Sequence, residues 1–196
     1  MKKFEFTEDF IDVSGRKLFR IKALISFGNV KKGDLGGYIG KEENLSHYGY
    51  AWVYGNAKVY GNAKVYGDAK VYRNAKVYGN AKIFGNAKVS GNAKVSGNAK
   101  ISGNAKISGN AEIYGNAKVS GNADYSTVKG FENIYRNTTF FKQKDDSIGV
   151  VCGCFYGTVD EFRAKVKQTH GDSELLKEYL EIADLMELHF NKEEED

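Results

Sequence analysis

The sequence predicts a mainly β protein built around a solenoid of short strands, and three observations indicate it. Alanine recurs thirteen times at a spacing of six between Ala51 and Ala123, and such a short fixed period is the signature of a solenoid. Within each unit, such as VYGNAK, apolar and polar residues alternate, as in a strand with one buried face. Gly-Asn follows in most units and tolerates positive φ, so each unit is one short strand and one corner.

Residues 1–44 are expected to close the N-terminal end of this solenoid. The segment FIDVSGRKLFRIKAL predicts a β-hairpin with Ser14 and Gly15 at its turn, and GDLGGYIGKEENLS leads into the regular tract as degraded units. A cap is needed because the first coil has no neighbour on its outer side.

The repeat loses its phase after the last regular alanine, so the solenoid is expected to span residues 45–124 and a C-terminal cap residues 125–196. The segment TTFFKQKDDSIGVVCGCFYG predicts a second β-hairpin. TVDEFRAKVKQTHG carries a capping box, Thr158 with Glu161, and predicts a helix that ends at Gly171. DSELLKEYLEIADLMELHF predicts a second amphipathic helix. Two helices with a short joint predict an αα-hairpin on the end of the solenoid.

The repeated unit, aliphatic-x-G-x-A-x, resembles the hexapeptide repeat of left-handed parallel β-helices, in which three units form one triangular coil. The flanking segments GDLGGYIGKEENLS and GCFYGTVDEFRAKVKQTHGD are more specific than the repeat. With them, nearly the whole chain resembles the hexapeptide-repeat proteins of phages and prophages, the YdcK-type proteins among them. The resemblance implies a left-handed parallel β-helix of a little over four coils and a phage origin, but it brings no established activity.

Hexapeptide-repeat acyltransferases use the same solenoid, so catalysis is one alternative. They resemble one another in placing a histidine base at a cleft between the subunits of a trimer. This chain has three histidines, His47, His170 and His189, and none lies in the regular coils. The sequence has no GxSxG, no P-loop and no cluster at metal-ligand spacing. We therefore expect a protein that is not an enzyme and needs neither cofactor nor metal.

The cysteines and the hydropathy pattern favour the cytoplasm, which is the host cytoplasm for a phage protein. Cys152 and Cys154 are the only cysteines, and two small core residues in a reducing compartment explain them better than a strained bridge. MKKFEF is not followed by the apolar run of a signal peptide. No stretch approaches the ~18 apolar residues of a membrane span, so no membrane partner is expected.

The outward positions of successive coils line up every eighteen residues and produce rows of lysine beside rows of tyrosine. Residues 45–124 carry a net charge of +8, and residues 172–196 carry −8. The lysine rows could solubilise a flat surface, meet the acidic C-terminal helix of this chain or of a neighbouring chain and so guide assembly, or bind an external anion. Aromatic rings beside lysines are the chemistry that stacks bases and neutralises phosphates. The residues we select for such a ligand site are Lys58, Lys64, Lys76, Lys82, Tyr60, Tyr66, Tyr78 and Arg73.

The sequence thus predicts a non-enzymatic, phage-associated binding protein, such as a host-defence antagonist that sequesters a small nucleotide or binds a host protein. A self-assembling structural protein is a further alternative. Long nucleic acid is disfavoured, because the basic residues are spread over all faces and no nucleic-acid motif appears. The six aromatic residues from Tyr54 to Phe84 would form a large exposed patch unless a subunit covered them. We therefore expect a homo-oligomer, with a trimer favoured.

Overall fold

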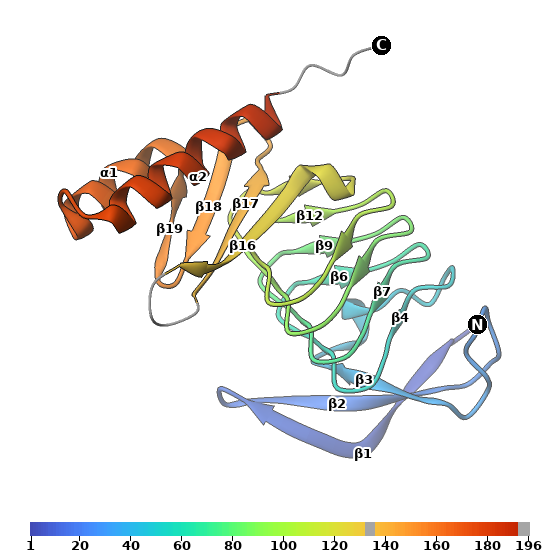
Figure 1. Cartoon of the computed structure of the whole chain (residues 1–196). Helices are drawn as coiled ribbons and strands as arrows, with labels where there is room; N and C mark the ends of the chain where they lie inside the picture. Colours follow the sequence, from blue (N-terminus) through green and yellow to red (C-terminus); the bar gives the residue numbers. More distant parts are fainter. Residues whose placement is uncertain (132–135, 192–196) are drawn as a thin grey trace, which may run out of the picture.

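The computed structural model describes residues 1–131 and 136–191, and it confirms a mainly β protein with a solenoid between two caps (Figure 1). The N-terminal cap contains the hairpin of β1 (Phe4–Val13) and β2 (Arg16–Ala23), then β3 (Leu35–Ile39) and the 3-10 helix η1 (Glu42–Asn44). Ser14 and Gly15 form the hairpin turn with φ of 53° and 76°, as the sequence predicted.

The solenoid consists of twelve two-residue strands, without an inserted loop between residues 51 and 123. The strands are β4 (Trp52–Val53), β5 (Lys58–Val59), β6 (Lys64–Val65), β7 (Lys70–Val71), β8 (Lys76–Val77), β9 (Lys82–Ile83), β10 (Lys88–Val89), β11 (Lys94–Val95), β12 (Lys100–Ile101), β13 (Lys106–Ile107), β14 (Glu112–Ile113) and β15 (Lys118–Val119).

Three strands make one coil, and each strand pairs in parallel with the strand eighteen residues further on. The coils therefore build three flat sheets. We call β5, β8, β11 and β14 the first face, β6, β9, β12 and β15 the second face, and β4, β7, β10 and β13 the third face. The first face continues through β3 into the N-terminal hairpin as one seven-stranded sheet.

The interior holds the predicted columns of alanine and branched aliphatic residues, which are at most 1% exposed from Ala51 to Val119. At several corners the backbone is too close to the next coil for a side chain. A Cβ on Gly91, whose φ is 69°, would lie 2.6 Å from the Gly109 carbonyl oxygen. Arg73 occupies such a corner with φ of 62°, a conformation that costs a residue other than glycine of order 1–3 kcal/mol.

Side chains supply hydrogen bonds to the terminal coils, whose outer backbone groups have no further coil to pair with. At the N-terminal end, the Lys3 ammonium donates to the Ala51 carbonyl at 2.8 Å, and the Asn44 amide donates to the Ala63 carbonyl at 2.7 Å. At the other end, the Glu112 amide donates to Thr139 Oγ1 at 3.1 Å. The caps therefore cover the end coils and also supply hydrogen bonds to their backbone groups.

The C-terminal cap is an antiparallel sheet of β16 (Tyr125–Phe131), β17 (Arg136–Lys142), β18 (Ile148–Cys152) and β19 (Phe155–Thr158), preceded by η2 (Asn122–Asp124) and covered by α1 (Val159–His170) and α2 (Glu174–Phe190). Alternate residues point to opposite sides of this sheet. Phe141 and Val151 belong to the solenoid core, whereas Phe140 and Val150 pack with the helices.

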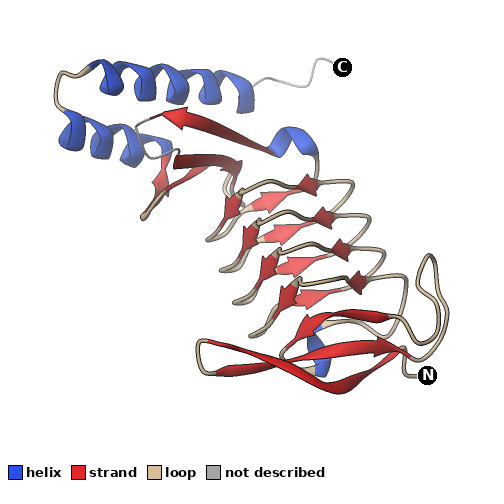
Figure 2. Cartoon of the chain, turned by 60° about the horizontal axis from the view of Figure 1, so that its bottom comes forward, coloured by secondary structure: helices blue, strands red, loops and turns tan. Residues whose placement is uncertain are grey.

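This arrangement refines the predicted position of the αα-hairpin. The helices pack on the outer side of the sheet, and most of the contact with the last coil comes from the sheet (Figure 2). The Thr158 capping box and the helix end at Gly171 are as predicted, and β16 was not predicted. Among the described residues, no helix has both the length and the apolar character needed to cross a bilayer.

Candidate anion-binding face

The eight residues selected from the sequence fall on different faces of the solenoid. The first face carries Lys58, Lys76, Tyr60 and Tyr78, and the second face carries Lys64, Lys82 and Tyr66. Arg73 is exposed at the corner between the third and first faces. The eight residues therefore do not form one site, and the environment of each lysine row decides which face can bind an anion.

The second face presents the lysine row with the least internal neutralisation. Its four lysines are all exposed and pair in register along the sheet. Adjacent strands lie about 4.8 Å apart, so the row is roughly 14 Å long. Within the described part of the chain, none of these side chains forms an ion pair. The row consists of Lys64, Lys82, Lys100 and Lys118.

The lysines of the first face are half-buried and partly engaged with their surroundings. Lys94 Nζ forms an ion pair of 2.6 Å with Glu112, and Lys58 Nζ donates to the Asn56 carbonyl at 3.1 Å. Burial lowers the pKa of Lys58, and the adjacent Lys76 lowers it further. This face therefore attracts an external anion less strongly than the second face.

The third face is also a weaker candidate, because its row of outward residues begins with a tryptophan instead of a lysine. Trp52 is 1% exposed and packs edge-on against Phe27 of the N-terminal cap. The next residue in the row, Lys70, is half-buried, whereas Lys88 and Lys106 are exposed. Two exposed lysines remain here, against four on the second face.

The tyrosine rows form stacked pairs that are more buried than the sequence suggested. Tyr60 stacks on Tyr78 with ring centroids 5.2 Å apart, and Tyr66 stacks on Phe84 at 5.1 Å. All six aromatic residues from Tyr54 to Phe84 are half-buried. Burial raises the pKa of Tyr60 and of Tyr66. The apolar surface that would need a subunit to cover it is thus smaller than expected.

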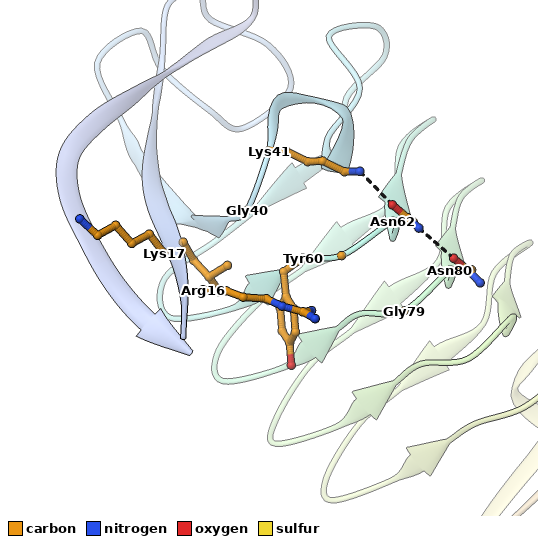
Figure 3. A pocket seen from close by; sticks show the side chains of 10 residues that line it. Arg16, Lys17, Gly40, Lys41, Tyr60, Asn62, Gly79 and Asn80 are labelled. Atoms are coloured by element: carbon orange, nitrogen blue, oxygen red, sulfur yellow. Dashed lines mark hydrogen bonds between the residues drawn. The ribbon is translucent and has the colours of Figure 1, made fainter. Parts of the chain in front are cut away.

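A hollow of about 550 Å³ lies between the hairpin turn and the first coil (Figure 3). Arg16 points toward Tyr60, and Lys41 Nζ donates to Asn62 Oδ1 at 2.9 Å. Lys17 points away from the hollow, and its ammonium lies 4.5 Å from the Phe10 ring centroid. Two cations and one aromatic ring therefore border this N-terminal hollow.

The N-terminal hollow adjoins the beginning of the second face. A smaller hollow of about 320 Å³ shares Lys41 and Asn62 with it and reaches Lys64. Sequence reasoning selected Tyr60 and Lys64 but missed Arg16 and Lys41, because the cap brings these two to the solenoid from outside the repeat. The sequence signal that could have indicated Arg16 is the pair of basic residues after the predicted turn, in the segment SGRK.

A second large hollow, which we call the C-terminal hollow, lies at the other end of the second face. It measures about 470 Å³. The turn between β17 and β18 contributes Lys144, which the sequence analysis also missed. The hollow is also lined by Phe84, Lys100, Ser102, Asn116 and Lys118. The second face therefore has a hollow with basic walls at each end.

The acidic helix α2 does not cover the lysine rows within this chain. Its carboxylates Asp184 and Glu187 bind Arg163 of α1 at 2.6 and 2.7 Å, and Glu174 binds Lys177 at 2.7 Å. No ion pair joins a described residue of α2 to a lysine of the solenoid. The interpretation in which the rows meet this segment of the same chain therefore has no support in the described contacts.

None of the three histidines lies in the regular strands of the solenoid: His47 lies between η1 and β4, and His170 and His189 lie in α1 and α2. Both ring nitrogens of His47 are engaged: Nε2 lies 2.7 Å from Glu42 Oε1, and Nδ1 accepts from the Lys3 amide at 3.0 Å. His189 Nε2 lies 3.1 Å from the Ala123 carbonyl. Over the described residues, no three His, Cys, Asp or Glu side chains are grouped as a metal site would require.

Cations and aromatic rings thus make up the chemistry available on the second face, and they suit binding better than proton transfer. Comparison with known proteins adds no activity to this description. A scan against protein-family models finds no match for the sequence, and a search of curated proteins finds none either.

Proposed function

We propose that this chain is a non-enzymatic binding protein whose second face takes a small anionic, nucleotide-like ligand. The observation that carries the proposal is the row of Lys64, Lys82, Lys100 and Lys118, exposed and without an internal counter-ion among the described residues. Four like charges at strand spacing repel one another. A bound anion relieves that repulsion, and the stacked pair of Tyr66 and Phe84 offers an aromatic surface beside it.

We further propose a phage origin and action in the cytoplasm of the host cell, which rest on the resemblance of the flanking segments to phage and prophage proteins. A protein that sequesters a nucleotide signal, and so antagonises host defence, needs affinity but no catalytic group. A host protein with an acidic surface is the alternative partner for the same lysines.

Calorimetric titration of the chain with AMP, ADP, cyclic AMP and pyrophosphate at low and moderate salt tests the proposal. Lys82→Glu changes the local charge by two units about 6 Å from a bound phosphate, which in water amounts to about 1.4 kcal/mol, or about tenfold in affinity. The matched control is Lys88→Glu, the same exchange in the same coil on the third face, where the lysine is also exposed.

Weakened binding in Lys82→Glu with little change in Lys88→Glu is the expected result. The affinity of the unaltered protein should also fall as salt rises, because bound counterions are released. Equal losses in both variants would mean that only the net charge matters. Absence of binding by the unaltered protein would reject the proposal and leave the lysines as a solubilising surface.

The acyltransferase alternative is tested separately. Its general base would have to be a histidine free to accept a proton from the substrate, and both nitrogens of His47 already have partners. Turnover of acetyl-CoA with an amine or alcohol acceptor, followed as free thiol release, would overturn the proposal of a non-enzymatic protein.

A further inference from the structure

The aromatic row on the second face ends with one ring face uncovered. Tyr66 and Phe84 are stacked almost parallel, with 2° between their planes. The next residue of the row, eighteen positions on, is Ser102, and Ser120 follows it. The two serine Oγ atoms lie 3.3 Å apart. Where a third ring would continue the stack there is open space, and Phe84 and Ser102 both border it.

The comparable row on the first face has no such opening. There Tyr78 is followed by Ser96, which is only 9% exposed, and then by Tyr114. Tyr114 packs against the solenoid core, and its hydroxyl donates to Glu112 at 2.7 Å. Of the stacked pairs Tyr60–Tyr78 and Tyr66–Phe84, only the second adjoins a hollow of this size on its C-terminal side.

Three cations surround the open position. Lys100 and Lys118 leave the same face as Ser102 and Ser120, two residues earlier along each strand, which is a separation of about 7 Å. Lys144 approaches from the cap, and its backbone amide donates to the Asn116 carbonyl at 3.1 Å. That bond fixes the turn against the coil and holds Lys144 beside the last lysines of the row.

Among the described residues, the acid closest in sequence to these lysines forms no ion pair with them. Asp145 follows Lys144, but its carboxylate accepts from the Ser147 hydroxyl at 2.7 Å and from the Ser147 amide at 3.3 Å. Within the described residues, neither Lys100, Lys118 nor Lys144 takes part in an ion pair. A net positive hollow with an aromatic wall remains.

We propose that the C-terminal hollow is a nucleotide site. The base stacks on the free face of Phe84 at the level of Ser102, and the phosphate lies among Lys100, Lys118 and Lys144. The separation of about 7 Å between ring and lysines leaves room for a sugar, and a hollow of about 470 Å³ lies within the usual range of ligand pockets. This inference rests on the proposed function and assigns the ligand class and its position.

Replacing Ser102 by tyrosine tests the position of the base. The repeat itself carries tyrosine at the equivalent position 66, so Ser102→Tyr is compatible with the fold, and the new ring would occupy the place of the base. The control is Ser108→Tyr, the same exchange on the third face, where the serine is exposed, whereas Ser102 is half-buried. Titration with AMP, and with pyrophosphate as a ligand without a base, separates the two contacts.

The expected result is at least a fivefold loss of AMP affinity in Ser102→Tyr, since stacking of one base contributes that much or more. Pyrophosphate affinity should change less than twofold. Lys144→Glu should weaken both ligands, whereas Lys106→Glu on the third face should leave both close to the unaltered value. Unchanged AMP affinity in Ser102→Tyr would overturn the inference.

The possible failures are distinguishable. Loss of AMP binding in Lys82→Glu but not in Ser102→Tyr or Lys144→Glu would keep the proposed function and reject this site. Lack of binding to the unaltered protein would reject both. Affinity for oligothymidylates that keeps rising with length and is insensitive to Ser102→Tyr would replace the nucleotide site by a polyanion lying along the lysine row.

Discussion

Lys3 is a buried charge whose effect on stability should depend on pH. Its side chain lies against the first coil, where the ammonium donates to the carbonyls of Ala51 and Gly49 and stands 4.9 Å from the centre of the Phe27 ring. Lys3 is 1% exposed. Burial lowers its pKa from 10.5 to about 8, and attraction to Asp68 offsets only part of that effect.

The sign of the pH dependence follows from these two values. Below about pH 8, Lys3 is protonated in both the folded and the unfolded chain, and the folded state bears the full cost of burying the charge. Between about pH 8 and 10.5, the unfolded chain holds a proton that the folded chain has released. The contribution of Lys3 to the free energy of unfolding therefore rises with pH in this window. The total is roughly 3 to 3.5 kcal/mol, at 1.36 kcal/mol per pH unit.

Lys3→Met isolates this contribution, because the other lysines and tyrosines titrate in both proteins. Urea unfolding at several pH values gives the difference in unfolding free energy between the two. A neutral amine still donates to both carbonyls, so the bonds to Gly49 and Ala51 survive deprotonation. Between about pH 7 and pH 10, we expect the unfolding free energy of the unaltered protein to rise by about 2 kcal/mol relative to that of Lys3→Met. A difference that stays constant within about 0.5 kcal/mol would refute the reasoning.

Two further predictions concern the core and the oligomer. Ala99→Leu overfills a completely buried column and should lower the unfolding free energy by about 1–3 kcal/mol in a urea titration. The control, Lys100→Leu on the exposed face, should change the unfolding free energy by less than about 0.5 kcal/mol. Tyr60→Glu combined with Tyr78→Glu should give monomers in light scattering if the aromatic rows form the predicted subunit interface. An unchanged mass would shift attention to the exposed Phe10 of β1.

The solenoid could be predicted almost completely because each unit repeats the same pattern of inward residues and the same corner residues. Alanine and valine set the inward phase, and Gly-Asn sets the corner, so thirteen consistent copies outweigh the ambiguity of any single unit. The caps lack that redundancy. β16 was missed because its sequence, YSTVKGF, contains no repeat and follows directly on the last unit. It pairs with β17, the next strand along the chain, from Phe131 opposite Arg136 to Tyr125 opposite Phe141.

The candidate site was predicted only in part, for a related reason. Periodicity places Lys64, Lys82 and Tyr66 on one face, because eighteen residues make one coil. The periodicity alone does not show which face can bind a ligand, because the other two faces carry similar residues at their outward positions. The distinction depends partly on the repeat, where Glu112 neutralises Lys94, and partly on the N-terminal cap, whose Phe27 packs on Trp52. Such coverage becomes visible only in three dimensions.

In the proposed site, the uniform lysine row would select the class of ligand, and the interruption of the aromatic row would fix the ligand's position. An unbroken stack of tyrosines would leave no ring face free along the row. An unbroken row of lysines would offer a ligand the same contacts at every coil, so the ligand would have no preferred position. On the second face the stack stops at Phe84, where Ser102 follows, and the cap turn adds Lys144 close to that point. The end of an aromatic row and the start of a cap coincide there. A ligand that needs both a ring partner and several cations can satisfy both at this place, whereas along the regular coils the neighbouring rings already occupy the stacking positions.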